Sequence, residues 1–297
     1  MFTGLSAFPH SPLRNDVFDE ESYASLVMRL VTAGVDSITA LGSTGSYMYL
    51  DRAERRRVAE TAVRHAGEIP VLVGIGALRT SFVRHLADDA QQAGASAVLL
   101  APVTYQALGD DEIFGLFEDV TSGLSVPLVV YDNPGTTHVS FSDELYARIT
   151  ALPNVASLKI PGVPAEPREA RARVDSIRAH VPSGVSIGVS GDASAATGLN
   201  AGCDVWYSVI GGTLPETALR LTRASRAGDH VAATAESTRL EPLWALFRDF
   251  GSYRVTAAIA EYLGLVAADS LPRPVRGLEG DARRRVARVV EELELRA

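Results

Sequence analysis

Short apolar runs alternate along the chain with longer segments in which apolar positions recur at helical spacing. The runs are rich in aliphatic residues, which is typical of strands buried on both faces. Eight of them are predicted as strands: 4–8, 35–41, 71–76, 97–101, 128–131, 155–159, 185–189 and 205–209. The segments between and after them are predicted as helices: 18–33, 52–65, 81–93, 111–121, 141–152, 166–180, 193–200 and 215–227. Asp51 and Ser142 are suitable caps for two of these helices.

The regular order of the elements predicts a (β/α)8 barrel in residues 1–227, an α/β fold in which each strand is followed by a helix. The alternative, a doubly wound open sheet, usually has a glycine-rich loop after its first strand. Here that strand leads into Pro9-His-Ser-Pro12, which cannot form such a loop. Residues 228–297 contain three further helical patterns, at 228–250, 253–263 and 281–295, and are expected to pack on the barrel as a C-terminal extension.

Charge and composition indicate which kinds of partner the protein can bind. The net charge is −8 and the isoelectric point is about 5.3, so a basic nucleic-acid-binding face is not expected. No apolar run reaches transmembrane length, and the N-terminus resembles no signal peptide. Cys203 is the only cysteine, which excludes an internal disulfide. We therefore expect a cytoplasmic protein that acts on a small molecule and has neither a nucleic-acid nor a membrane partner.

The only lysine, Lys159, is the first candidate for chemistry. The other 27 of the 28 basic residues are arginine, and Lys159 ends the sixth predicted strand. A lysine buried there would have a lowered pKa, and its neutral amine could attack a ketone to form an imine. Arginine cannot do this because it does not deprotonate. The alternative is a lysine whose ammonium group reaches solvent at the mouth of the barrel.

Tyr131 ends the neighbouring fifth strand and could share a cavity with Lys159. Its phenol could move protons to and from substrate oxygens, or its ring could simply fill the core. The turn Leu41-Gly-Ser-Thr-Gly-Ser46 follows the second strand, which lies opposite the sixth in a ring of eight. Ser43, Thr44 and the backbone amides there could bind a carboxylate.

Two more loops are expected at the same end of the barrel. Ser190-Gly-Asp192 follows the seventh strand, and Val209-Ile-Gly-Gly212 follows the eighth. They could hold a phosphate or form one wall of a substrate site. The histidines and Cys203 show no metal-ligand spacing, so no metal is expected.

These motifs resemble the dihydrodipicolinate synthase and N-acetylneuraminate lyase family of class I aldolases, over essentially the whole chain. The resemblance rests on Gly4-Leu-Ser-Ala-Phe-Pro9, Gly42-Ser-Thr-Gly45, Tyr131-Asp-Asn-Pro134, Leu158-Lys159 and Ser190-Gly-Asp192. It implies a barrel with a helical tail, and often a homotetramer built as a dimer of dimers. It also implies that Lys159 is the Schiff-base lysine, Tyr131 the proton relay, and Ser43 with Thr44 the carboxylate-binding pair.

Three positions depart from the family pattern. Ser46 stands where a glutamate is usual, and Thr136 stands where the synthase branch has an arginine for the second substrate. Thr104 takes the place of a tyrosine lent to a neighbouring subunit, with Tyr105 displaced by one residue. Arg254 is one candidate to replace the missing arginine. We assign six further residues to the substrate pocket: Thr104, Tyr105, Thr136, Gly191, Asp192 and Tyr207.

The sequence thus predicts an imine-forming lyase or aldolase acting on pyruvate or a related 2-oxo acid, with no cofactor or metal because the imine supplies the electrophile. A dihydrodipicolinate synthase or a sugar-acid dehydratase on the same scaffold stays open. A non-catalytic protein that binds an oxo acid is the alternative from another class.

Overall fold

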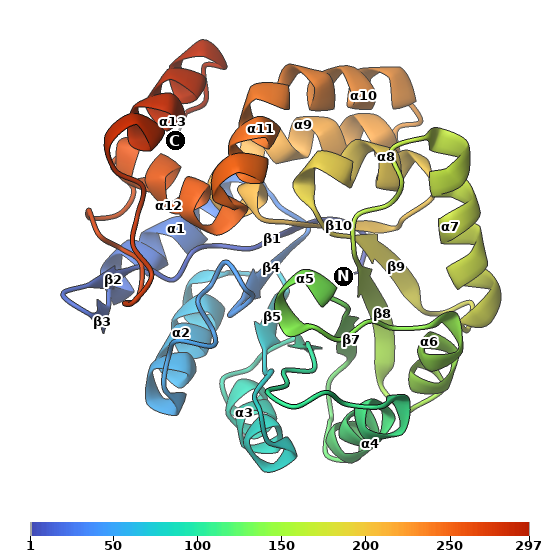
Figure 1. Cartoon of the computed structure of the whole chain (residues 1–297). Coiled ribbons are helices and arrows are strands. Elements are labelled where there is room, and N and C mark those ends of the chain that lie inside the picture. The colour runs from blue at the N-terminus through green and yellow to red at the C-terminus, as the bar shows by residue number, and fades with distance from the viewer. Residues whose placement is uncertain (1, 297) are drawn as a thin grey trace.

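The computed structural model describes residues 2–296 and contains a closed barrel of eight parallel strands (Figure 1). In chain order the barrel strands are β1 (Gly4–Ala7), β4 (Ser37–Ala40), β5 (Val71–Gly74), β6 (Ala97–Leu100), β7 (Leu128–Tyr131), β8 (Val155–Ile160), β9 (Ser186–Val189) and β10 (Val205–Ser208). Each strand pairs with its neighbours in sequence, and β1 closes the ring against β10. The predicted (β/α)8 barrel is confirmed.

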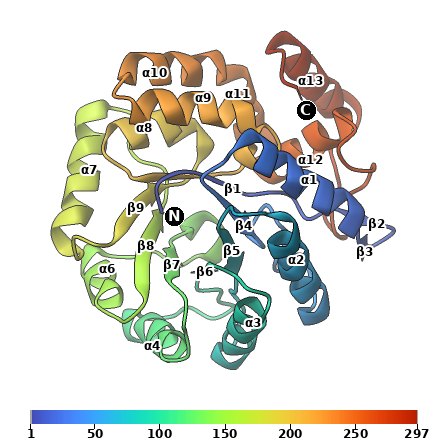
Figure 2. The ribbon, with the colours of Figure 1, turned by 180° about the vertical axis from the view of Figure 1, so that it is seen from behind.

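Helices form the outer layer of the barrel, as both the front view and the view from behind show (Figures 1 and 2). They are α1 (Glu20–Ala33), α2 (Arg52–His65), α3 (Thr80–Gln92), α4 (Asp110–Thr121), α6 (Asp143–Thr150), α7 (Pro167–His180), α8 (Ala195–Asn200) and α9 (Pro215–Arg226). Asp51 caps α2 in a capping box with Glu54, and the Ser142 side chain accepts from the Leu145 amide to begin α6.

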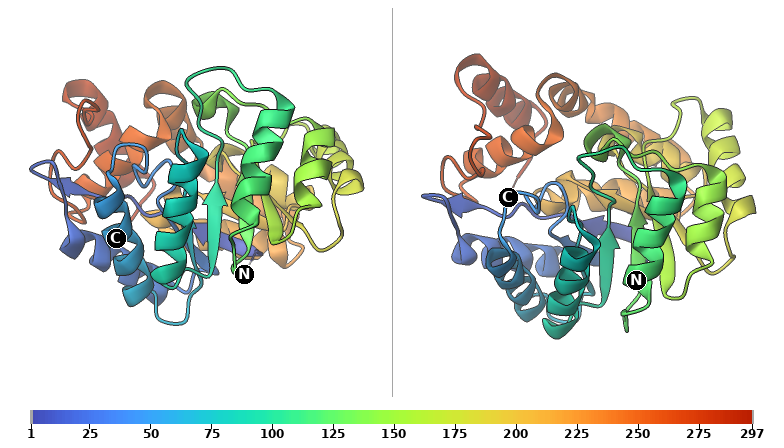
Figure 3. Two further views of the ribbon diagram at one scale, coloured as in Figure 1. Left: turned by 90° about the horizontal axis from the view of Figure 1, so that it is seen from below. Right: turned by 60° about the horizontal axis from the view of Figure 1, so that its bottom comes forward.

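The C-terminal helices lie beside the barrel, where Figure 3 shows them in orange and red. They are α10 (His230–Arg239), α11 (Glu241–Phe250), α12 (Ser252–Tyr262) and α13 (Gly280–Glu292). The prediction of one helix over 228–250 is wrong, because the chain divides at Leu240. Pro242 stands in the first turn of α11, where its missing amide hydrogen costs little, whereas in a helix interior it would remove a hydrogen bond.

Several short elements were not predicted. A hairpin pairs β2 (Leu13–Arg14) with β3 (Val17–Phe18) through Asn15 and Asp16, which both have positive φ, as a tight two-residue turn requires. It delays the start of α1, which Asp19 caps, to Glu20. The single turn α5 (Pro134–Thr137) follows β7, and the 3-10 turns η1 (Asp192–Ser194) and η2 (Ile210–Gly212) follow β9 and β10.

Alternate residues of each strand point into the barrel. Leu72, Leu99, Val129 and Val205 form a buried cluster inside it, together with the rings of Tyr131 and Tyr207. Neighbours such as Leu158 belong instead to the cluster packed beneath the helices. This alternation decides which side chains reach the interior. Among residues 2–296, no helix is both long enough and apolar enough to span a membrane.

Candidate active site

Lys159 lies near the carboxyl end of β8 and is directly paired in register with Tyr131 of β7. The strand alternation directs its side chain into the barrel, where the residue is only 3% exposed. The Nζ atom lies 3.8 Å from the ring centroid of Tyr131 and 3.9 Å from that of Phe8, with the Tyr207 ring 5.8 Å away. The amine therefore sits in an aromatic cage and is largely shielded from solvent.

Burial lowers the pKa of Lys159 from 10.5 to about 7, because the ammonium form loses its hydration. The negative charge of Asp192 acts in the opposite direction and moderates this shift. A lysine with this pKa has a large neutral fraction near pH 7, which an ordinary lysine lacks. The amine is thus able to act as a nucleophile toward a carbonyl group.

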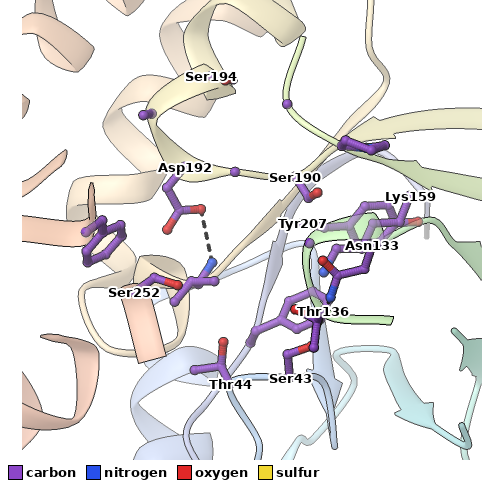
Figure 4. Close-up of a pocket in the computed structure, with 18 of the residues that line it drawn as sticks. Ser43, Thr44, Asn133, Thr136, Lys159, Ser190, Asp192, Ser194, Tyr207 and Ser252 are labelled. Atoms are coloured by element: carbon purple, nitrogen blue, oxygen red, sulfur yellow. Dashed lines mark hydrogen bonds between the residues drawn. The ribbon is translucent and has the colours of Figure 1, made fainter. Parts of the chain in front are cut away.

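Asp192 is fully engaged in hydrogen bonds inside the protein. Its carboxylate accepts from Trp206 Nε1 at 3.0 Å and from the amides of Val209 and Ile210 at 3.1 and 2.8 Å. Figure 4 shows the bond to a backbone nitrogen as a dashed line. Burial nevertheless raises the Asp192 pKa. Through these three hydrogen bonds Asp192 fixes the loop after β10.

Tyr131 is buried, and burial raises the pKa of its phenol. A hydrogen bond with Ser43 opposes that shift. The phenol is therefore neutral at physiological pH and can donate a proton to an oxygen in the cavity. Asn133 also reaches this point, since its Nδ2 donates to Ser43 Oγ at 3.4 Å. Tyr131 and the turn after β4 meet at the mouth of the barrel.

The turn that carries Ser43 and Thr44 depends on close packing against Phe8. At Gly42 a Cβ atom would lie 2.4 Å from Phe8 Cδ1, so a larger residue would displace this ring, which contacts Lys159. Leu41 and Ser46, at either end of the turn, have φ values of 57° and 60°. The barrel order places this turn opposite Lys159, as predicted, and Figure 4 shows both hydroxyl side chains beside the cavity.

A cavity of about 500 Å³ joins these groups at the carboxyl ends of the strands. Its lining includes eight of the ten residues predicted for the site: Ser43, Thr44, Tyr131, Thr136, Lys159, Gly191, Asp192 and Tyr207. The remaining two lie outside it in this chain. The Thr104 hydroxyl donates to the carbonyl of Gln106, and Tyr105 is 88% exposed. Arg254 also lies outside, with its Nε donating to the carbonyl of Arg276 at 3.2 Å.

One wall of the cavity was missed by the sequence analysis. It is formed by the C-terminal helices: Trp244, Phe247 and Arg248 of α11, and Ser252 and Tyr253 of α12. The spacing of the α11 residues marks one helical face, but helical spacing does not say which surface that face covers. Phe8 was also missed, although it belongs to a motif that the sequence analysis used. Among residues 2–296, no three His, Cys, Asp or Glu side chains are grouped as a metal site.

Comparison with known proteins agrees with this geometry. The model of the dihydrodipicolinate synthetase family matches residues 1–293. The chain belongs to that family. A 4-hydroxy-tetrahydrodipicolinate synthase of Parvibaculum lavamentivorans is 31% identical over 273 residues, which is 90% of each chain. One from Phenylobacterium zucineum is 29% identical over 276 residues, covering 91% of this chain and 90% of the other.

Solved structures of the family superpose over nearly the whole molecule. The dihydrodipicolinate synthase of Agrobacterium tumefaciens has a TM-score of 0.94 and 43% identity, with 98% of both chains covered. A putative dihydrodipicolinate synthetase of Pseudomonas aeruginosa has a TM-score of 0.90 and 26% identity, covering 99% of this chain and all of the other. The predicted activity class is thereby confirmed: the protein is a lyase of the lysine-imine, class I aldolase type that acts on small molecules.

The family position that is usually glutamate has a specific contact here. Ser46 Oγ lies 2.6 Å from the hydroxyl of Tyr253, so this serine ties the turn after β4 to the start of α12. In this chain the turn after β4 is thus held by a contact with the C-terminal helices.

Proposed function

We propose that the protein forms an imine between Lys159 and the C2 carbonyl of pyruvate or a related 2-oxo acid, and then makes or breaks a carbon–carbon bond at C3. The observation that carries this proposal is the burial of the only lysine in an aromatic cage, with a pKa of about 7. No other side chain lining the cavity is an amine.

The reaction follows from the positions of the groups. The neutral Nζ attacks C2, the carbonyl oxygen leaves as water, and the protonated imine becomes an electron sink. In the condensation direction, loss of a C3 proton gives an enamine, which attacks an aldehyde carbon, and water then releases the product and the amine. Tyr131 carries the protons that leave or join the substrate oxygens. Ser43 and Thr44 bind the adjacent C1 carboxylate from the turn after β4, the strand opposite β8.

Two related activities stay open on the same scaffold. The 4-hydroxy-tetrahydrodipicolinate synthase reaction lacks support at Thr136, because a threonine cannot form the bidentate contact that an arginine makes with a carboxylate. A sugar-acid dehydratase would use the same imine to eliminate a hydroxyl group. The uncommitted hydroxyls of Thr136, Ser194 and Ser252 in the cavity are compatible with such a substrate.

Borohydride trapping with pyruvate tests the proposal. Reduction should fix the imine as a stable adduct on Lys159, which digestion and mass spectrometry would locate. The chain has no other lysine, so only the N-terminal amine competes. The Lys159→Arg variant keeps the positive charge but has no lysine amine, and it should yield no adduct on this peptide. Absence of an adduct with pyruvate and with longer 2-oxo acids would overturn the proposal.

Proton exchange separates an enzyme from a protein that only binds oxo acids. An active lyase should exchange the methyl protons of pyruvate with deuterated water, because the enamine forms reversibly. A non-catalytic binding protein would be trapped by borohydride but would leave the methyl protons unexchanged.

We further propose that the chain assembles as a homotetramer built from two dimers. Support comes from an exposed apolar rim, which we define as Met48, Tyr49, Leu78, Phe82 and Tyr105. These side chains are 43% to 88% exposed and lie after the adjacent strands β4, β5 and β6. A group of large, exposed apolar side chains at neighbouring loops is typical of a protein interface.

A further inference from the structure

Arg248 is the only cationic side chain other than Lys159 among the described residues that line the cavity. It belongs to α11, where Trp244 and Phe247 share its face and also line the cavity. Lys159 is committed to the carbonyl carbon under the proposed function. Arg248 is therefore the one group in the lining that can neutralise a second negative charge.

The present partner of Arg248 is a residue of its own helix. Arg248 Nη2 donates to Glu241 Oε1 at 2.5 Å, and the two side chains are 59% and 57% exposed. Exposed ion pairs of this kind contribute little because water screens the charges. An arginine held this weakly can exchange one carboxylate for another, and its planar fork suits bidentate binding of a carboxylate.

Nearby hydroxyls are also uncommitted. The side chains of Thr136, Ser194 and Ser252 form no hydrogen bond with other residues in 2–296, although all three line the cavity. Others are already engaged: Ser190 Oγ donates to the carbonyl of Ile160 at 2.8 Å, and the Tyr207 hydroxyl lies 2.7 Å from Ser157 Oγ. Ser194 ends η1 and Ser252 begins α12, so these two hydroxyls come from elements other than β8, which carries Lys159 (Figure 4).

The wall that bears Arg248 is fixed relative to the carboxylate-binding turn. Gly251, with φ at 79°, separates α11 from α12, and Tyr253 follows at the start of α12. The contact between Tyr253 and Ser46 joins this point to the turn that carries Ser43 and Thr44. The helix that bears Arg248 is therefore held in place relative to a substrate whose C1 carboxylate binds this turn and whose C2 atom is bonded to Lys159.

We propose that Arg248 exchanges Glu241 for a second carboxylate of the substrate, so that the enzyme selects 2-oxo acids with an acidic far end. In the cleavage direction the released aldehyde would carry that carboxylate. The hydroxyls of Thr136, Ser194 and Ser252 would hydrogen-bond the atoms between the two ends. This inference rests on the proposed imine chemistry of Lys159 and assigns to α11 the contact that Thr136 cannot make.

The test compares acids that differ only at the far end. The concentration for half-maximal borohydride trapping on Lys159 would be measured for 2-oxoadipate against 2-oxohexanoate, and for 2-oxoglutarate against 2-oxopentanoate. Each value would be divided by that for pyruvate in the same protein, which removes general effects on imine formation. In at least one pair the dicarboxylate should be trapped at about a tenfold lower concentration, the size expected for a charged hydrogen bond.

Three variants test whether a preference for the dicarboxylate depends on Arg248. Arg248→Gln should reduce the ratio within each pair to near one, whereas Glu241→Gln should increase it by removing the competing carboxylate. Arg254→Gln is the matched control, because this neighbouring arginine lies outside the cavity, and its ratios should match those of the wild type.

Equal trapping within both pairs in the wild type would overturn the proposal, as would a preference that survives Arg248→Gln. A wild-type protein that traps pyruvate but shows no preference refutes only the role of Arg248. Failure to trap pyruvate refutes the proposed function, and the inference drawn from it falls as well.

Discussion

At the scale of single residues, two opposing effects set the state of Lys159. Removal of water disfavours the ammonium form, while three aromatic rings and the charge of Asp192 favour it. The result is a pKa of about 7, well below 10.5. An amine at this point is nucleophilic at neutral pH, and its conjugate acid is still strong enough to return a proton.

The pH dependence of imine formation follows from this pKa. Below pH 7 most of Lys159 is protonated, so the initial trapping rate with pyruvate should rise about tenfold per pH unit and level off above a midpoint near 7. Rapid-quench trapping from pH 5.5 to 9 would measure the curve. A rate that still rises about tenfold per pH unit up to pH 9 would instead indicate a hydrated, ordinary lysine.

Protein stability gives an independent control for the same pKa. The pKa of Lys159 is about 7 in the folded state and about 10.5 in the unfolded chain, so between these values the unfolded state binds more protons. The free energy of unfolding should therefore rise with pH in this window. Lys159→Met has no titrating group here and should lack this contribution.

At the scale of elements, the site depends on a glycine in the strand next to Lys159. Gly188 of β9 is paired in register with Lys159, and a Cβ atom there would lie 2.3 Å from Tyr207 Cε2 and 2.4 Å from Val205 Cγ1. The missing side chain gives space to the Tyr207 ring, which faces the amine. The backbone of one strand thus determines the cage around a residue of another.

The Gly188→Ala variant should therefore be less stable and less active. Overpacking of a buried site costs about 1–3 kcal/mol, which urea unfolding would measure, and the displaced ring should slow imine trapping. Gly184→Ala is the matched control, because nothing lies within 4 Å of its added methyl group. Equal stability of the two variants would contradict this prediction and would show that Tyr207 and Val205 can move to accept the added methyl group.

Elements with a strong local pattern of apolar residues could be predicted from the sequence. Features that depend on packing between distant segments could not. Barrel strands and helices such as Arg52–His65 follow from local patterns. The division at Leu240 was missed because the apolar pattern continues across it. The wall formed by Trp244 and Arg248 could not be predicted, because helical spacing identifies a face but not the surface it packs against. Lys159 was found because its type and position were both unusual.

At the scale of the whole molecule, net charge and local charge act in opposite directions. The chain carries −8 overall, which disfavours the approach of an anionic 2-oxo acid. The attraction must therefore be local, and within the described lining it comes from Lys159, Arg248 and the amides and hydroxyls of the turn at Ser43. The barrel interior below is filled by apolar side chains, so substrate enters from the end that α11 and α12 border.

Assembly is the remaining property at this scale, and the apolar rim makes it testable. Tyr105 is 88% exposed, and in a tetramer it would be buried against a second copy of the chain. Light scattering with size-exclusion chromatography should give a tetramer for the wild type and smaller species for Tyr105→Glu, because a buried, unpaired carboxylate is costly. Val17→Glu is the control: Val17 is 56% exposed but lies in the β2–β3 hairpin, outside the rim, and this variant should remain tetrameric. A monomeric wild type, or a Tyr105→Glu variant of unchanged mass, would contradict the proposal. In that case the exposed rim would need another partner, and each active site would be complete within one chain.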